Sequence, residues 1–499
     1  MRALQRASVV RELEGAPEPW QLVELYRDDP WLALLESTGE VTHHGRYAFL
    51  CVDPFWVFQS KRAECFSGPP SDLQRLEGDP LDELAQLLEW GQATFSPETE
   101  KAACPLMVGG FVGYLGYELL YLMERVPDVG LDDLALPDSS LVLFHTIIAH
   151  DRQTGRSWVA SHGFASELQG AQRDAEARSR ATLERISGYA RSRDDDAAWR
   201  EQLRARREAL LSRRPRLTSG ALAQLGVRPV LDEPAYLDVV RRAKEHIFAG
   251  DVFEVCTTNR FETNHTGSGL ELYRHLRVVN EAPFSAYLRS PDVEILSASP
   301  ERFVSLDREG WAETRPIKGT RPRGRTPEED RAWYDELARS EKDRAENVMI
   351  ADLARNDLGR VCELGTVSVP SLQAIESYAF THQLVSTVRG HLRPGRGPVE
   401  LLRAAFPGGS MTGAPKVEAM KIIEQLEPVK RGIYSGSIGY FGFDGTVDLS
   451  IVIRTFVKKG ERLTFHVGGA VVADSEPEAE HQELLDKAHG LVVALELAP

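Results

Sequence analysis

The sequence has few cysteines, and none of them stands in a motif. Five of its 499 residues are cysteines, an odd number without a CxxC or Cys/His spacing: Cys51, Cys65, Cys104, Cys256 and Cys362. This pattern argues against both a disulfide framework and a zinc site. We therefore expect a reducing compartment and place the protein in the cytoplasm.

Long hydrophobic runs and an excess of positive charge are also missing. No run approaches the roughly 18 apolar residues that span a bilayer, and the N-terminus lacks the apolar core of a signal peptide, so we expect no membrane partner. The chain has 59 Lys and Arg against 75 Asp and Glu, a net charge of −16. This balance disfavours a nucleic-acid partner, but it does not exclude a local basic pocket for a small anion.

The remaining composition is that of a globular protein with several domains. Hydrophobic residues make up 42% and charged residues 27% of the chain, enough to bury large cores. At about 150 residues per domain, the length predicts two to four units. A stretch rich in Ala, Arg and Glu over 166–216 marks a boundary. We predict an N-terminal domain (1–190), a charged helical connector (191–229) and a C-terminal domain (230–499).

Helix signals are clearest in the C-terminal domain. Residues 232–250 read as an amphipathic helix that begins at Asp232 or Glu233 and ends near Gly250. A capping box at Thr326 and Glu329 opens a long helix that is predicted to run to residue 357. A second capping box, from Ser475 to Glu478, predicts the start of the last helix.

Strand signals accompany these helices. Asp444-Gly445 is a hairpin turn between the predicted strands 434–443 and 446–457, and 462–473 could add a third antiparallel strand. Because helices and strands are grouped rather than strictly alternating, we predict an α+β fold with a mainly antiparallel sheet.

Lys318 stands where a polar strand meets a glycine turn, in the segment Arg315 to Arg321. A lysine attacks carbon only where burial or cationic neighbours depress its pKa, and Arg315 and Arg321 are candidate neighbours. The segment thus predicts a nucleophile, with a solvated surface charge as the alternative.

Two helices carry acidic residues at helical spacing: Asp343 and Glu346 on one, Glu480 and Glu483 with Lys487 on the other. Spacings of three and four place each set on one face. If the two faces meet, their carboxylates form an oxygen-only site suited to Mg²⁺. Otherwise each is a solvated acidic face.

Three further features could bind an anion or simply build the fold. The glycine-rich run from Pro407 to Lys416 leads into a helix, whose N-terminal amides favour an anion. Arg454 lies inside an apolar predicted strand and must meet a carboxylate of the protein or of a ligand. Gly468-Gly469 lets a ligand approach the backbone, or marks a bulge.

Over residues 230–497 the chain closely resembles the catalytic domain of the chorismate-utilising enzymes. The matching segments are SASPERF, PIKGTRPRG, KDRAENVMIADLARNDLGRV, AFPGGSMTGAPKVEAM, YSGSIGYF, DLSIVIRT and ADSEPEAEHQELLDK. The N-terminal half is similar more loosely, through LLES and PFSAYL, which stand where anthranilate synthases bind feedback tryptophan. The resemblance implies antiparallel sheets packed together and surrounded by helices, and a candidate tryptophan site made of Leu35, Glu36, Ser37, Pro283, Phe284 and Ser285.

Within this family, a lysine in PIKGT marks the aminodeoxychorismate synthases, whereas anthranilate synthases usually have alanine there. The resemblance implies that Lys318 adds to C2 of chorismate as the 4-hydroxyl leaves with a proton from Glu301, and that ammonia then enters at C4. It implies that Glu346 and Glu483 hold Mg²⁺, supported by Asp343 and Glu480. The implied substrate-binding residues are Thr320, Ser410, Tyr434, Arg454, Gly468, Gly469, Ala470 and Lys487.

The sequence departs from the family pattern at three positions. The family's catalytic histidine corresponds to Gln383, and His382 stands one place earlier; we keep His382 as the candidate, although one residue changes the face of a strand. Ala470 replaces a glycine. Glu254 stands where many relatives have glutamine, or the lysine base of isochorismate and salicylate synthases.

The resemblance also predicts a partner. No glutaminase nucleophile motif of the GxCxG type is present, so we expect ammonia from a glutamine amidotransferase subunit in a heterodimer, for the synthesis of p-aminobenzoate and folate. Two alternatives remain: anthranilate synthase component I, and a non-catalytic tryptophan-binding homologue.

Overall fold

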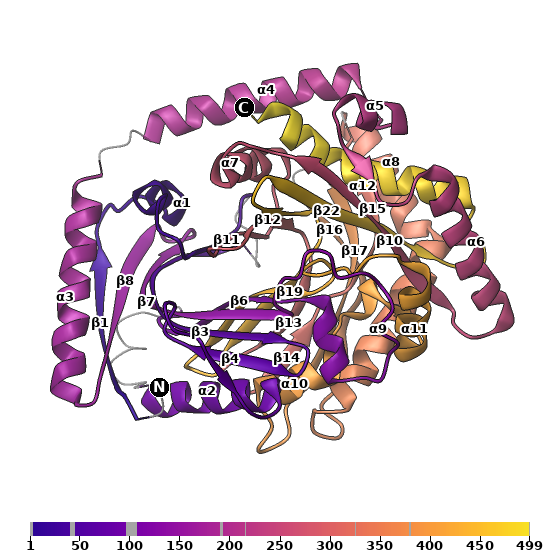
Figure 1. The fold of residues 1–499 in the computed structure, drawn as a ribbon. Helices are drawn as coiled ribbons and strands as arrows, with labels where there is room; N and C mark the ends of the chain where they lie inside the picture. Colours follow the sequence, from indigo (N-terminus) through magenta and orange to yellow (C-terminus); the bar gives the residue numbers. More distant parts are fainter. Residues whose placement is uncertain are drawn as a thin grey trace.

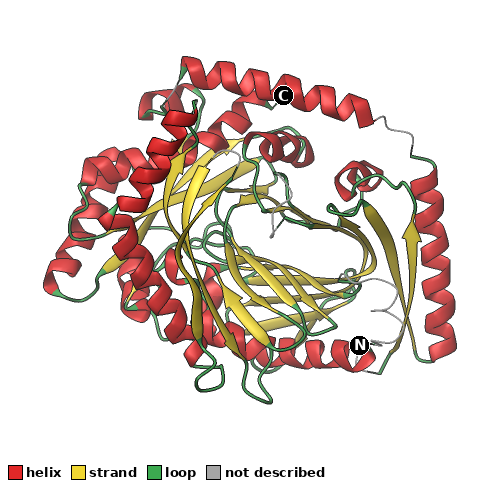
Figure 2. Cartoon of the chain, turned by 180° about the vertical axis from the view of Figure 1, so that it is seen from behind, coloured by secondary structure: helices red, strands yellow, loops and turns green. Residues whose placement is uncertain are grey.

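The fold was analysed in a computed structural model, which describes residues 3–39, 45–95, 107–189, 193–214, 216–324, 326–378 and 381–498. Cys104 and the predicted boundary at 190/191 lie outside these ranges. In Figures 1 and 2 the strands fill the interior of the molecule and the helices lie around its periphery. None of the helices in these ranges combines the length and apolar character needed to cross a bilayer.

The strands form one hydrogen-bonded network in which every strand pair is antiparallel, so the predicted α+β fold with a mainly antiparallel sheet is confirmed. Part of the network, which we call the first ladder, runs in the order β9–β10–β22–β21–β12–β11–β2–β3–β7–β8–β1. Its strands are β9 (Arg228–Pro229), β10 (Glu254–Asn264), β22 (Arg462–Val471), β21 (Thr455–Lys459), β12 (Glu294–Ser299), β11 (Phe284–Arg289), β2 (Leu32–Glu36), β3 (Tyr47–Lys61), β7 (Ser139–Asp151), β8 (Arg156–Ala165) and β1 (Gln5–Leu13).

The second ladder branches from β7 and runs in the order β6–β19–β20–β13–β14–β17, with β15 and β16 both paired to β17. Its strands are β6 (Gly110–Leu115), β19 (Ser437–Gly442), β20 (Val447–Ile451), β13 (Arg302–Leu306), β14 (Trp311–Thr314), β17 (Thr381–His391), β15 (Ile317–Pro322) and β16 (Ser368–Ser377). Three short strands complete the network: β4 (Glu64–Gly68), β5 (Gln74–Leu76) and β18 (Gly413–Ala414).

Helices cover the outer faces of the two ladders. One apolar cluster joins the first ladder to α6, α7, α11 and α12, a second joins the second ladder to α2, α9 and α10, and a third draws on strands of both ladders. The helices are α1 (Pro19–Leu22), α2 (Pro80–Thr94), α3 (Leu168–Ser187), α4 (Arg193–Arg213), α5 (Ser219–Gln224), α6 (Glu233–Ala249), α7 (Gly269–Val279), α8 (Pro327–Arg339), α9 (Glu341–Gly359), α10 (Pro398–Ala405), α11 (Lys416–Leu426) and α12 (Pro477–Leu497).

Strands from the two ends of the sequence pair with one another. β2 pairs with β11, and β6 pairs with β19, so the N-terminal 190 residues and the C-terminal 270 share one hydrogen-bonded network. The predicted connector forms α4 and α5, and α4 packs on α7 and α12. The division of the chain into these three segments stays a prediction.

The helix signals were right in two places and wrong in two. Asp232 caps α6 by accepting a hydrogen bond from the Ala235 amide, and the helix ends at Gly250 in the left-handed conformation. Thr326 likewise caps α8. The predicted helix from 326 to 357 is in fact two helices, because Ser340 ends α8 and its hydroxyl caps α9.

The predicted capping box at Ser475 is the second correction. α12 begins one residue later, with Glu476 at the N-cap position and Pro477 in the first turn. The Ser475 hydroxyl instead donates to Glu480 at 2.6 Å and accepts from the Val472 amide at 3.1 Å. The Ser475 hydroxyl therefore orients the Glu480 carboxylate on α12 and does not cap the helix.

Candidate active site

Two neighbouring crossings of the chain form the floor of the site. β12 and β21 are paired in the first ladder, and β13 and β20 are paired in the second, so the chain passes between ladders at Pro300–Glu301 and again at 452–454. Backbone hydrogen bonds tie the crossings together, from Ile451 N to Glu301 O (3.0 Å) and from Ala298 N to Arg454 O (3.2 Å). Glu301 and Arg454 are thereby held side by side.

This geometry corrects the prediction of one strand over 446–457. The segment is two strands, β20 and β21, and Arg454 lies between them with a positive φ of 50°. A chain that changes ladders cannot remain one straight strand. The turn at Arg454 makes the crossing and places a guanidinium at the site.

Glu301 is buried, and two donors reach its carboxyl group. The Ser410 hydroxyl donates to Oε1 at 3.0 Å, and the Ile317 amide donates to Oε1 at 3.4 Å. Burial raises the pKa of Glu301 to about 7, and the two donors and the nearby Lys318 oppose that rise only in part. A carboxyl group with this pKa can donate a proton at neutral pH.

Lys318 is buried on β15 and faces Glu254 on β10. Its Nζ donates to Glu254 Oε1 at 2.8 Å. Burial by itself would lower the lysine pKa, but the Glu254 carboxylate, with Glu346 further away, raises it above the ordinary value.

The prediction that Arg315 and Arg321 depress this pKa is therefore wrong. Arg315 pairs with Glu376, and Arg321 pairs with Glu336 and Asp343. Both cations are neutralised by carboxylates that sequence spacing could not reveal.

The predicted acidic sets come from α9 and α12 and approach the same cavity. Glu346, Glu483 and Asp343 line it, and Asp343 is paired there with Arg321 at 2.7 Å, whereas Glu480 lies behind Gly469. Glu346 Oε1 and Glu480 Oε2 are buried without a hydrogen-bond partner. Unsatisfied carboxylate oxygens are costly unless a cation or a donor meets them.

These oxygen donors fit Mg²⁺, which is usually held by one or two protein carboxylates together with water and ligand oxygens. Across the described ranges, no three Asp, Glu, His or Cys side chains are close enough to hold a metal ion by themselves. A metal bound here would therefore need oxygens from water or a substrate.

A cavity of about 430 Å³ unites these groups. Within the described ranges, Arg454 has no carboxylate at ion-pair distance, which leaves its charge directed to a ligand. The predicted residues that line the cavity are Glu301, Lys318, Thr320, Asp343, Glu346, Ser410, Tyr434, Arg454, Gly468, Gly469, Ala470, Glu483 and Lys487.

Space around two positions of β22 favours glycine. A Cβ at Gly468 would lie 2.5 Å from the Thr257 carbonyl oxygen on β10, and a Cβ at Gly469 would lie 3.0 Å from Glu480 Oε2. Beside them, Lys487 Nζ donates to Gly468 O and pairs with Glu483, both at 2.8 Å. The lysine thus lies between the β22 backbone and the acidic face of α12.

His382 does not reach the cavity. Its ring contacts Ser377 Oγ at 2.7 Å and Asp330 Oδ1 at 3.1 Å, on the opposite face of β17, whereas Gln383 lines the cavity. Successive strand residues point to opposite faces. The catalytic role carried over to His382 therefore finds no support in this geometry.

Among the cavity residues that the sequence analysis missed are His466 and Lys342. His466 is buried, its ring stacks on Tyr434 with centroids 5.0 Å apart, and its Nε2 has no hydrogen-bond partner. A histidine within the apolar strand LTFHV was the available signal. For Lys342, one turn before Glu346, the sequence offered no signal beyond helical spacing.

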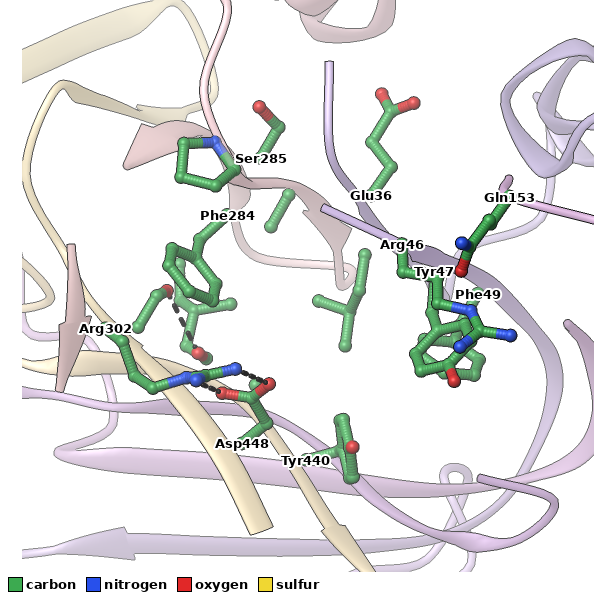
Figure 3. Close-up of a pocket in the computed structure, with 16 residues that line it drawn as sticks. Glu36, Arg46, Tyr47, Phe49, Gln153, Phe284, Ser285, Arg302, Tyr440 and Asp448 are labelled. Carbon is green, nitrogen blue, oxygen red and sulfur yellow. Dashed lines mark hydrogen bonds and ion pairs between the residues drawn. The ribbon is translucent and has the colours of Figure 1, made fainter. Parts of the chain in front are cut away.

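A second cavity, of about 640 Å³, lies among most of the predicted tryptophan-site residues (Figure 3). Leu35, Glu36, Pro283, Phe284 and Ser285 line it, whereas Ser37 lines an adjoining cavity. The Glu36 carboxylate points away from the cavity centre in Figure 3 and is bound by Arg277 (2.8 Å) and Tyr273 (2.8 Å). Glu36 therefore contributes to the wall but is not free to hold a ligand's ammonium group.

The sequence and the fold of this chain are both similar to those of known proteins. The sequence profile of a family described as chorismate binding enzyme matches residues 33–492. An aminodeoxychorismate synthase of Streptomyces pristinaespiralis is 44% identical over 396 residues, which cover 78% of this chain and 51% of that protein. The chain thus spans about half the length of that relative.

Two further proteins match over nearly their full length. Aminodeoxychorismate synthase component 1 of Bacillus subtilis (strain 168) is 36% identical over 483 residues, which cover 95% of this chain and 96% of that protein. The crystal structure of anthranilate synthase component I from Streptococcus pneumoniae TIGR4 superposes with a TM-score of 0.74 at 27% identity, covering 91% of this chain and 93% of that one.

Proposed function

The chain belongs to the chorismate binding enzyme family, and we propose that it aminates chorismate at C4 to give 4-amino-4-deoxychorismate, the precursor of p-aminobenzoate and folate. One observation carries the proposal: Lys318, a buried lysine, shares a single cavity with Glu301, a buried carboxylic acid. A nucleophile and a proton donor on one cavity are the two groups that a covalent substitution needs.

In the proposed reaction, Lys318 Nζ forms a bond to C2 of chorismate while the ring double bonds shift and the C4–O bond breaks. Glu301 donates its proton to the departing oxygen, which leaves as water. Ammonia then forms a bond to C4, the double bonds shift back, and the C2–N bond to Lys318 breaks. Dividing one difficult substitution into two steps is the gain from covalent catalysis.

The remaining cavity residues hold the two substrate carboxylates. Arg454 supplies a half-buried guanidinium that has no described carboxylate at ion-pair distance, and guanidinium–carboxylate pairs are strong, charge-assisted contacts. Ser410, Tyr434, Lys487 and the β22 backbone complete the walls. Thr320 and Ala470 line the same cavity.

We propose that Glu346 and Glu483 hold Mg²⁺, with Glu480 and Asp343 orienting the site. Glu346 Oε1 and Glu480 Oε2 are buried without a hydrogen bond, and the one cation near Glu346 Oε1 among the described side chains, Lys342 Nζ, lies 3.9 Å away, which supports this assignment. When bound, the ion would neutralise and orient a substrate carboxylate.

Ammonia would come from a separate glutamine amidotransferase subunit. The described cysteines, Cys51, Cys65, Cys256 and Cys362, are free and buried, and burial raises the pKa of each thiol. Such thiols are poor nucleophiles and could not release ammonia from glutamine. Free thiols also accord with the reducing cytoplasm in which we place the enzyme.

We further propose that the 640 Å³ cavity binds tryptophan. Phe49, Phe284 and Tyr440 offer an aromatic wall for the indole ring, whereas the lining cations Arg46 and Arg302 are already paired with Asp151 and Asp448. Calorimetric titration with tryptophan tests this, with alanine as the ligand that lacks the ring. Equal heats for both amino acids would refute it.

The decisive experiment is a product assay. Purified protein is incubated with chorismate, Mg²⁺ and ammonium, and the product is identified by chromatography and mass, with EDTA as the metal-free arm. The expected product keeps its pyruvyl group and yields p-aminobenzoate only after a lyase is added. Anthranilate with free pyruvate would identify an anthranilate synthase instead.

Lys318→Ala should abolish C4 amination, lowering kcat by at least about 10³-fold because it removes the amine that forms the covalent adduct in the proposed reaction. Pyruvate release is assayed in parallel, since anthranilate synthases carry alanine at this position. Lys421→Ala removes a partly exposed lysine that is paired with Glu418 on α11, outside the cavity, and serves as the control. Amination at the wild-type rate in Lys318→Ala would exclude the covalent role.

A further inference from the structure

Glu254 lies behind Lys318, outside the lining of the 430 Å³ cavity. Its side chain is fully buried on β10, and the strand is fixed there by pairing of Glu254 with Ala414 on β18. Oε1 accepts from Lys318 Nζ, and Oε2 is buried without a hydrogen-bond partner. Lys318 lines the catalytic cavity, whereas Glu254 does not. The carboxylate thus reaches the lysine but not a ligand in the cavity.

This arrangement presents a chemical problem for the proposed reaction. The contact with Glu254 favours the ammonium form of Lys318, and an ammonium has no electron pair with which to attack carbon. Before the N–C2 bond can form, one proton must leave Nζ. The acceptor has to be a group in contact with that nitrogen, or water.

The other titratable groups around the lysine are less well placed. They come from four segments around the cavity: Glu301 before β13, Glu346 on α9, Cys256 on β10, and Glu483 and Lys487 on α12. Glu301 is held by Ser410 and the Ile317 amide, and Glu483 by Lys487. Among the described side chains, only Glu254 is hydrogen-bonded to Nζ.

We propose that Glu254 is the general base that takes the proton from Lys318 before the amine attacks C2, holds it during the reaction and returns it at the end. This inference rests on the proposed covalent role of Lys318. Glu254 touches the attacking nitrogen and would therefore be a catalytic residue.

The protons balance over the whole cycle. Transfer of one proton converts the ammonium–carboxylate pair into an amine and a carboxylic acid. The amine forms the N–C2 bond and becomes a positively charged adduct, while Glu301 gives its proton to the departing hydroxyl. Attack by ammonia at C4 breaks the C2–N bond and releases a neutral amine, to which Glu254 returns its proton. Glu301 recovers a proton from the C4 ammonium of the product.

The proposal makes a specific statement about pH. Because the Glu254–Lys318 pair keeps one proton in total, the fraction with a neutral amine does not depend on pH while the pair holds that proton. Without the carboxylate, Lys318 must lose its proton to solvent, and the neutral fraction then rises about tenfold per pH unit below the lysine pKa.

The test measures adduct formation in full-length protein with chorismate and Mg²⁺ but no ammonia. Samples are quenched at successive times, and the intact-protein mass reports the fraction carrying the adduct. Glu254→Gln preserves the size of the side chain but removes the base. Glu262→Gln makes the same substitution further along β10, where Glu262 pairs with Arg260 and Arg462, and is the matched control. Melting temperatures report whether each variant folds.

We expect Glu254→Gln to form the adduct at least about tenfold more slowly at about pH 6, within the usual range for loss of a general base. Its rate should then rise with pH, so that its optimum lies above that of the wild-type protein. Glu262→Gln should match the wild-type protein. Glu254→Asp keeps a carboxylic acid and should keep the wild-type pH dependence at a lower rate, which tests the proposal even if Glu254→Gln does not fold.

The outcomes separate the two proposals. If the wild-type protein forms no adduct, the covalent mechanism fails. If it does, and Glu254→Gln matches both its rate and its pH dependence, the covalent step stands and the role of Glu254 is refuted. The role of Glu254 is also refuted if the rate of adduct formation falls toward acidic pH in Glu254→Asp but not in the wild-type protein.

Discussion

At the scale of single residues, burial determines the pKa shift of one titrating group of the cavity and is outweighed by a charge partner at another. Glu301 has donors but no paired cation, so burial dominates and its pKa rises to about 7. Lys318 has a carboxylate within hydrogen-bond distance, so the pair prevails over burial and its pKa also rises. The acid is therefore poised near neutrality, whereas the lysine needs a base.

Glu301→Gln removes the proton donor and should lower kcat by about 10²–10⁴-fold. In the wild-type protein the rate of adduct formation should fall as pH rises through about 7, because the acid form of Glu301 is lost. The single-turnover pH profile checks this. A profile that stays flat well above neutrality would contradict the assignment of Glu301 as the acid.

Stability gives an independent test of the Glu301 environment. Its folded-state pKa, about 7, exceeds the ordinary 4.5, so ionisation costs folding free energy. The wild-type free energy of unfolding should therefore fall, relative to Glu301→Gln, as pH rises between these values. At about pH 8 the relative loss should be at most about 3 kcal/mol. Equal melting temperatures of the two proteins at every pH would show that Glu301 titrates normally.

At the scale of elements, the position of Lys318 depends on an irregular β15 next to a helix break. Gly319 has a φ of +83°, and the β15–β17 register shifts between Ile317 and Thr320. A Cβ at Gly319 would lie 2.9 Å from Asp343 Cβ on α9 and from Leu337 Cδ1 on α8. The strand therefore approaches the junction of α8 and α9 as closely as glycine allows.

Gly319→Ala and Gly365→Ala form a matched pair, since both glycines have a φ of +83°. A Cβ at Gly365 meets nothing within 4 Å. Gly365→Ala should therefore be destabilised only by the left-handed backbone conformation, by about 1–2 kcal/mol. Gly319→Ala adds a clash, and we expect about 1–3 kcal/mol of further destabilisation. It should also lower kcat by displacing Lys318.

Denaturant unfolding and steady-state kinetics measure these effects. Gly365→Ala should keep the wild-type kcat. If the two variants were equally stable and equally active, the contact between Gly319 and the α8–α9 junction would have no energetic weight.

At the scale of the whole molecule, a buried ion pair joins the N-terminal and C-terminal parts of the sequence. Glu36 at the end of β2 accepts from Arg277 Nε (2.9 Å) and Nη2 (2.8 Å) on α7, and all these atoms are buried. The pair stands beside the β2–β11 pairing that unites the two segments. Removing one partner would leave the other charge buried and unpaired.

Glu36→Ala should accordingly cost about 3–5 kcal/mol of unfolding free energy. Glu176→Ala, which breaks an exposed pair with Arg11, should cost no more than about 1 kcal/mol. Chemical denaturation of both variants provides the comparison. A loss in Glu36→Ala as small as that of the exposed control would show that the buried pair does not hold the two segments together.

Sequence alone determined the features that depend on neighbouring residues. The α6 caps, the Asp444-Gly445 hairpin, the antiparallel α+β fold and the family were all readable, because capping, turn chemistry and contiguous motifs are local. Local signals also misled where two patterns overlapped. The helical period continued through Ser340 and hid a break, and the apolar run around Arg454 concealed a crossing between ladders.

Only the tertiary structure decided which charges meet. Sequence spacing placed Arg315 and Arg321 beside Lys318, yet distant carboxylates neutralise both, and Glu254, 64 residues away in sequence, holds the lysine. The pairing of β17 likewise settled that Gln383 rather than His382 faces the cavity. Electrostatic and steric contacts act through space between segments far apart in the chain, so proximity in sequence could not specify them.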